Sequence, residues 1–187
     1  MAETKNAQAL KTEGLRLFEE GMYEEAVQRF GQAQELFSAQ GDEVEAAEML
    51  NNLGVTYRIM HEWDKAQDAL EEAKATFARL GDKQREAQAL GNLGGLLASR
   101  GERLRAQEYL HQAADIFGKL EDYQKQGETL MSLGAQMWKA GDRRGGIAAY
   151  QAGLFALENP KTSQKALRRL LQLADRLLGG GRRLPEE

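Results

Sequence analysis

Residues 51–97 read NNLGVTYRIMHEWDKAQDALEEAKATFARLGDKQREAQALGNLGGLL, and this stretch begins and ends with nearly the same pattern. Asn52-Leu53-Gly54 near its start returns as Asn92-Leu93-Gly94 forty residues later. The same period runs through the chain, which has a glycine at four equivalent positions: Gly14, Gly54, Gly94 and Gly134. A fixed period of about 20 to 50 residues indicates a repeat architecture.

Each unit contains two stretches with the spacing of an amphipathic helix. The first has Leu50, Leu53 and Tyr57 on one stripe, and the second has Leu70 and Phe77. A short turn around residue 61 separates them, so each unit is predicted to be an antiparallel pair of helices. A glycine inside a helix costs about 1 kcal/mol relative to alanine. Four glycines at one register therefore predict that the helices of each pair approach closely there.

The junctions between units are also periodic. Gly41-Asp42, Gly81-Asp82 and Glu121-Asp122 stand at equivalent places. Glycine is favoured where a helix ends and aspartate where one begins. The predicted units cover about residues 7–41, 42–81, 82–121 and 122–160 of a single solenoid over residues 1–178.

Residues 162–178 align with the first helix of a further unit and place Leu170, Leu173 and Leu177 at its apolar positions. A solenoid ends in a helix with a polar outer face. We therefore expect a capping helix that buries these three leucines on the fourth pair. Residues 179–187, GGGRRLPEE, predict a flexible tail.

The composition argues against several classes of protein. The chain has no cysteine, which excludes disulfides and fits a reducing compartment. No apolar run approaches the roughly 20 residues of a membrane span, and the N-terminus lacks the apolar segment of a secretory signal. We therefore expect a cytoplasmic protein that does not bind a membrane.

The residues that carry chemistry are scattered. His61 and His111 stand fifty residues apart, so we expect no metal, no cofactor and no catalytic base. The glycines of residues 91–95 follow no predicted strand and therefore form no phosphate loop. The basic residues near the C-terminus have no aromatic residues between them, so nucleic acid is not an expected partner. These patterns do not indicate an enzyme.

Charge is distributed unevenly along the chain. Residues 1–80 carry 16 acidic and 8 basic side chains, a net charge of −8, whereas residues 139–187 carry 5 and 10, a net charge of +5. The simpler interpretation is two solvated surfaces of opposite sign. The alternative is weak head-to-tail self-association between the two ends.

At the level of motifs, the chain resembles the tetratricopeptide repeat (TPR) family. The segments LNNLGVTY and LGNLGGLL match the leucine-glycine core of that motif, and AVQRF matches its second helix. The chain departs from the usual period of about 34 residues and lacks the leading tryptophan. Units of forty residues are similar to those of GoLoco-containing polarity adaptors and of bacterial TPR regulators. The resemblance implies an all-α protein: a right-handed α-solenoid of four helix pairs plus a capping helix, nine helices in all.

The resemblance also implies that the first helix of each pair lines a concave groove. Carrying the family's groove positions onto this sequence gives ten candidate peptide-binding residues: Lys11, Phe18, Asn51, Asn52, Arg58, Gln88, Asn92, Gly95, Ser99 and Trp138. Asn52 and Asn92 occupy the same slot and could form a carboxamide ladder on a peptide backbone. Glycines around residue 95 predict a hollow for apolar side chains, and Phe18 and Trp138 are expected at opposite ends of the groove.

The function favoured by these patterns is a non-enzymatic scaffold or adaptor that binds a peptide or helix of a protein partner. The alternative is a ligand- or peptide-sensing regulatory module of a signalling system, in which binding changes the curvature of the solenoid.

Overall fold

The computed structural model describes the backbone of residues 2–178 and the side chains of residues 6–173. Residues 2–178 form nine α-helices and no strand. The bounds of the helices are α1 Ala2–Glu19, α2 Tyr23–Ala39, α3 Glu43–Ile59, α4 Trp63–Leu80, α5 Lys83–Arg100, α6 Arg103–Lys119, α7 Tyr123–Lys139, α8 Arg143–Ala156 and α9 Thr162–Leu178. The predicted tail, residues 179–187, lies outside the described residues.

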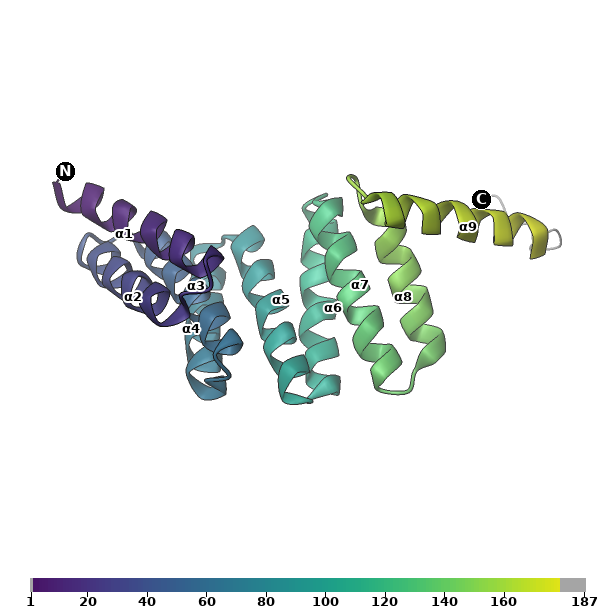
Figure 1. Ribbon diagram of the computed structural model, residues 1–187, viewed down its shortest axis with the longest axis horizontal. Helices are drawn as coiled ribbons and strands as arrows, with labels where there is room; N and C mark the ends of the chain where they lie inside the picture. Colours follow the sequence, from purple (N-terminus) through teal and green to yellow (C-terminus); the bar gives the residue numbers. More distant parts are fainter. Residues whose placement is uncertain (1, 179–187) are drawn as a thin grey trace.

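The first eight helices form four antiparallel pairs that stack along the long axis of the molecule (Figure 1). Each second helix also packs against the first helix of the following pair. The predicted all-α solenoid is therefore confirmed.

The repeated glycines lie where the two helices of a pair cross. A β-carbon at Gly54 would lie 2.5 Å from Cγ of Leu70, far inside a normal contact. One at Gly134 would lie 2.6 Å from the carbonyl oxygen of Gly146. The close approach predicted from the glycine column is confirmed.

The junctions between units combine a left-handed residue with an aspartate cap. Gly81 has a φ of 74°, and Asp82 accepts a hydrogen bond from the amide of Arg85 at 3.0 Å. At the next junction Glu121 takes the place of glycine with a φ of 57°, a conformation that residues with a β-carbon rarely adopt. The dipeptide pattern thus marks the ends of the helices as predicted.

The core consists of clusters that join neighbouring units. Phe37 of α2 packs with Met49 and Leu53 of α3, and Leu70 of α4 packs with Leu93 of α5. All five side chains are buried. Because each pair buries its apolar face on the next pair, the stability of a unit depends on its neighbours.

Helix α9 differs from the expected cap. It spans the predicted residues but projects away from the solenoid (Figure 1). Leu170 is 63% exposed and Leu173 is 52% exposed, so the prediction that they are buried on the fourth pair is wrong. The side chain of Leu177 lies outside the described residues. The N-terminal half of α9 contacts the fourth pair, where the guanidinium of Arg168 donates to the carbonyl oxygens of Leu154 and Leu157.

The repeat alignment supplies a physical reason. Arg169 of α9 occupies the position held by Met49 in α3 and by Ala89 in α5. Both of these residues are fully buried against the preceding pair. A guanidinium at that position would be buried without a partner, which is costly. The helix therefore leaves the surface of the fourth pair.

Candidate functional site

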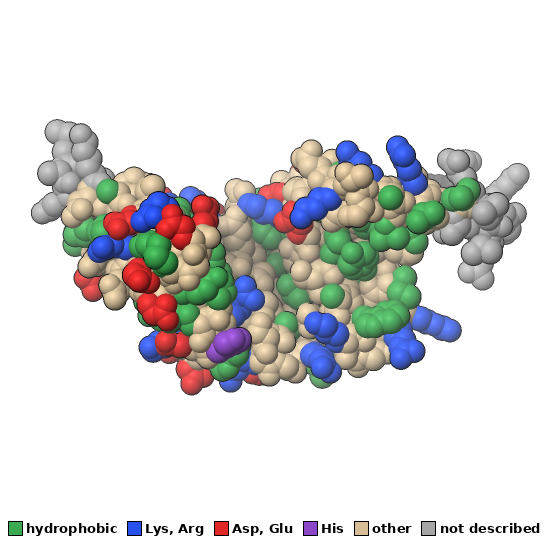
Figure 2. All heavy atoms as spheres, viewed as in Figure 1, with side chains coloured by type: hydrophobic (Ala, Val, Ile, Leu, Met, Phe, Trp, Pro, Cys, Tyr) green, Lys and Arg blue, Asp and Glu red, His purple; other side chains and the backbone are tan. Residues whose placement is uncertain are grey.

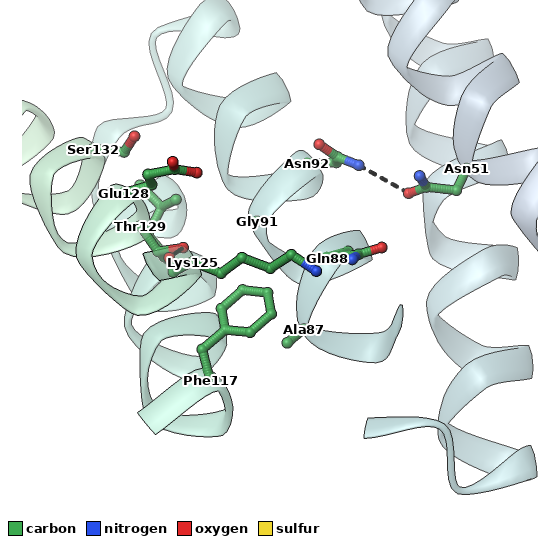
Figure 3. Close-up of a pocket in the computed structure, with 11 residues that line it drawn as sticks. Asn51, Ala87, Gln88, Gly91, Asn92, Phe117, Lys125, Glu128, Thr129 and Ser132 are labelled. Atoms are coloured by element: carbon green, nitrogen blue, oxygen red, sulfur yellow. Dashed lines mark hydrogen bonds between the residues drawn. The ribbon is translucent and has the colours of Figure 1, made fainter. Parts of the chain in front are cut away.

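A hollow of about 370 Å³ lies on the surface formed by the first helices of units two to four. Its walls come from α3, α5 and α7, and α6 supplies the floor (Figure 3). The lining residues are Asn51, Ala87, Gln88, Gly91, Asn92, Leu110, Phe117, Lys125, Glu128, Thr129 and Ser132. Three of the ten predicted groove residues, namely Asn51, Gln88 and Asn92, are brought together here.

The asparagines pair differently from the expectation, because Asn92 contacts Asn51 and not Asn52. The side-chain amide of Asn92 donates to Oδ1 of Asn51 at 2.9 Å, which links α5 to α3 (Figure 3). Asn52 is half-buried and does not line the hollow, while its carbonyl oxygen accepts a hydrogen bond from Thr56. The first helices of successive units are rotated relative to each other, so residues at the same position of the repeat need not face each other.

Polar and charged groups dominate the walls of the hollow. The ammonium group of Lys125 lies 5.7 Å from the ring centre of Phe117 and 3.6 Å from the carboxylate of Asp122. Glu128 accepts a hydrogen bond from Gln124 at 2.6 Å. The apolar lining residues Leu110 and Phe117 are almost completely buried, at 5% and 3% exposed. The hollow therefore offers hydrogen-bonding and charged groups to a polar segment, and the expectation that it also takes apolar side chains stays a prediction.

Lys11 is engaged within the chain. Its ammonium group lies 2.8 Å from Glu45 and 2.7 Å from Glu48, and its side chain is only 13% exposed. Burial alone would lower the pKa of Lys11, but the hydrogen bonds to the two carboxylates outweigh it and raise the pKa above 10.5. Because Glu48 also pairs with Arg85 at 3.2 Å, these four side chains tie α1 to α3 and α5.

Arg58 and Gly95 lie beside each other, outside the lining of the hollow. A β-carbon at Gly95 would be 3.8 Å from the guanidinium of Arg58. The Nε of Arg58 is buried and has no hydrogen-bond partner among the described residues. Ser99 is exposed, and its hydroxyl donates to the carbonyl oxygen of Gly95. The glycine-rich stretch thus contributes only Gly91 to the hollow.

The two predicted aromatic anchors have different surroundings. Phe18 packs on the core of the first units and meets Tyr23 edge-on, with ring centres 5.7 Å apart. Trp138 is 50% exposed, and the guanidinium of Arg143 lies 5.7 Å from its ring centre. Trp138 lines a separate cleft at the C-terminal end of the molecule. Phe18 is a packing residue, and only Trp138 presents an aromatic surface.

The described residues contain no group of histidine, aspartate and glutamate side chains able to hold a metal. His111 lies on an exposed surface, where Nδ1 is 3.1 Å from Asp115. Within residues 2–178, the helices are all too short or too polar to cross a bilayer.

The sequence pattern missed several residues of the hollow. Lys125 was detectable, because the column Glu45, Arg85 and Lys125 is charged in three successive units. Phe117 was not detectable, because it belongs to a second helix and its position resembles that of any other core residue. Its place in the floor depends on the gap that α5 and α7 leave between them.

Comparison with known protein families identifies the family of this chain. The tetratricopeptide repeat family matches residues 5–79 and again residues 45–119, which together make up more than half of the chain. The protein belongs to this family. Members of the family are generally non-catalytic, and the fold supports protein–protein interaction. Comparison with curated proteins finds no match.

Several solved structures share the fold. BtubC (BKLC) from P. vanneervenii has a TM-score of 0.72 and 23% identity, over 97% of this chain and 67% of that one. PilF of Pseudomonas aeruginosa has a TM-score of 0.68 and 18% identity, over 98% and 80% of the two chains. The Rap conjugation gene regulator of plasmid pLS20, solved with the Phr* peptide, has a TM-score of 0.71 and 17% identity, over 95% and 53%. At these identities the likeness concerns the fold alone.

Proposed function

We propose that this protein is a non-enzymatic interaction scaffold that holds a polar segment of a partner protein in the hollow of units two to four. One observation carries the proposal: the first helices of three successive units direct polar side chains into one hollow. A single helix pair could not build such a surface. The Rap regulator has the same fold and was solved with a peptide, which supports a peptide as the occupant.

The chemistry of the walls defines the occupant. Asn51 and Asn92 use one donor and one acceptor on each other, so each carboxamide keeps further groups for a peptide backbone. Lys125 offers a positive charge and Glu128 a negative charge on the same wall (Figure 3). We therefore expect an extended segment that carries both an acidic and a basic side chain.

Filling the hollow tests this proposal. Gly91 lies in the wall, and a β-carbon there would have no atom within 4 Å, so Gly91→Leu adds bulk without disturbing the core. Gly31 on α2 has equally open surroundings and lies outside the hollow, so Gly31→Leu is the matched control. A partner isolated by affinity capture on the wild-type protein is titrated against both variants by calorimetry.

We expect Gly91→Leu to weaken binding by about tenfold or more and Gly31→Leu to leave it unchanged. Asn92→Ala should weaken binding to a smaller extent, because one hydrogen-bonding wall residue is lost. Equal affinity of the wild-type protein and Gly91→Leu would place the binding surface elsewhere and refute the proposal. Small-angle scattering of the protein with and without its partner distinguishes a scaffold from a sensing module, because a sensing module requires the curvature of the solenoid to change on binding.

A further inference from the structure

A second cleft, of about 410 Å³, opens at the C-terminal end between the fourth helix pair and α9. Apart from Lys139 and Gln151, its lining is aromatic, aliphatic or glycine: Gly134, Ala135, Trp138, Gly146, Ile147, Tyr150, Leu167 and Leu171. Figure 2 shows hydrophobic side chains gathered over this end of the molecule, with lysine and arginine side chains around them. This chemistry differs from that of the polar hollow.

The glycines of the fourth pair explain why apolar side chains face outward here. A β-carbon at Gly127 would lie 2.7 Å from the carbonyl oxygen of Gly153, and the Gly134–Gly146 contact is equally close. The backbones of α7 and α8 therefore touch, and no large side chain fits between them. Ile147 is 47% exposed as a result, similar to Trp138.

The earlier units show what such a surface accommodates. In unit two, Leu70 is covered by α5, which buries Leu93 and Leu96 in the same cluster. Tyr150 is the equivalent of Leu70 in unit four, and it lines the cleft. Because α9 projects away, the part of the chain that the structure describes leaves open the place that a following first helix would take. The cleft therefore has the shape of a site for one amphipathic helix.

The charge around the cleft selects among possible helices. Lys139 lines it and Arg143 lies over Trp138, while Arg144 and Lys165 are exposed on α8 and α9, two of the helices that line it. Residues 139–187 carry a net charge of +5, from 10 basic and 5 acidic side chains. An occupant with acidic flanks is therefore favoured over a neutral or basic one.

A second copy of this chain fits poorly. In a head-to-tail stack α1 would take the open place, with Ala9 and Glu13 at the positions of Met49 and Leu53. Glu13, which is bound to Arg29 at 3.2 Å, would therefore bring a charged side chain to a position where Leu53 and Leu93 are buried. We propose that the cleft binds an amphipathic helix of a different protein, with apolar residues on one face and acidic residues beside them.

The test is a selection from a phage-displayed library of helical peptides, with counter-selection on the variant Ile147→Glu. Ile147 is half exposed, so the charge should not disturb folding, and far-UV circular dichroism checks this. Leu104→Glu is the matched control, because Leu104 on α6 is 72% exposed and lies outside the cleft. Fluorescence anisotropy of the enriched peptides measures affinity, and Trp138→Ala provides a second perturbation.

The expected peptides have apolar residues at helical spacing and a net negative charge. Their affinity should fall about tenfold or more in Ile147→Glu, remain unchanged in Leu104→Glu, and decrease as salt is raised. Enrichment of neutral or basic peptides, or equal binding to all variants, would overturn the proposal. Failure to enrich any peptide would also overturn it. A dimer that sedimentation detects and that Ile147→Glu dissociates would show instead that the cleft binds a second copy of this chain. Binding to phosphatidylglycerol vesicles that depends on the cleft, in place of peptide binding, would show that the occupant is a membrane.

Discussion

Replacing Gly94 by alanine should destabilise the protein, although alanine is the better helix former. Gly91 and Gly94 lie three residues apart on α5, and both are interior to the helix. A β-carbon at Gly91 would meet nothing within 4 Å, whereas one at Gly94 would lie 2.7 Å from Cγ of Leu110 and 3.2 Å from the carbonyl oxygen of Ala106. The two positions therefore separate helix propensity from packing.

The magnitudes follow from these contacts. Gly91→Ala should raise the free energy of unfolding by about 0.4–1 kcal/mol, because only the propensity term changes. In Gly94→Ala the same gain is opposed by overpacking, which costs about 1–3 kcal/mol in a close-packed core. The variants should therefore differ by about 2 kcal/mol in their free energies of unfolding, with the wild-type protein between them.

Urea unfolding followed by far-UV circular dichroism measures this difference. Gly31→Ala is a control in another unit, because its surroundings are as open as those of Gly91. It should stabilise the protein by about the same amount as Gly91→Ala. If Gly94→Ala were as stable as Gly91→Ala, the Leu110 side chain would move aside at no cost. Close helix packing would then not be the reason for the glycine column.

Two further predictions concern the unit junctions. Glu121→Gly should stabilise the protein by about 0.5–1 kcal/mol, because the native φ of 57° suits glycine. Urea unfolding measures this, and an unchanged midpoint would contradict the prediction. For Asp82, partial burial raises the pKa, but hydrogen bonds from the amide and guanidinium of Arg85 more than offset it and hold the pKa below 3.8. Its charge therefore stabilises the fold above the unfolded-state pKa, and that contribution is lost as pH falls through the folded-state pKa. The advantage of the wild-type protein over Asp82→Asn should be present at neutral pH and vanish in acid, and a gap independent of pH would refute this.

The forty-residue columns predicted the fold because each column reports a local constraint. Gly54 reports a helix crossing, and Gly81-Asp82 reports a helix end followed by a helix start. Such constraints act within one unit, and the same residue type meets them wherever the unit recurs. The structure of each unit can therefore be predicted well from a repeat sequence.

The path of α9 could not be predicted from its leucines. Leu170 and Leu173 have the spacing of a buried stripe, and that spacing suggested a cap. Arg169, directly before Leu170 in sequence, takes a position that is fully buried in α3 and α5. This one charged residue outweighs the two leucines that follow it, because a buried unpaired guanidinium costs more than they contribute.

The candidate site depended on the arrangement of units, which repeat columns do not encode. Asn52 and Asn92 share a column, yet Asn92 bonds to Asn51 across the groove. A shift of one residue turns a helical side chain by about 100°. The rotation between successive pairs thus decided which asparagine faced its neighbour, and only the structure shows that rotation.

Helix α7 borders both surfaces and determines how they can influence each other. Glu128 and Ser132 face the polar hollow, while Ala135 and Trp138 face the apolar cleft. Coupling between two sites requires an element with two arrangements that both ligands bias. The backbone of α7 lies against that of α8 at two glycine crossings, where a shift toward α8 would bring main-chain atoms into overlap. We therefore expect the fourth pair to move as one rigid body and the two surfaces to bind their partners independently, as the proposed scaffold would require.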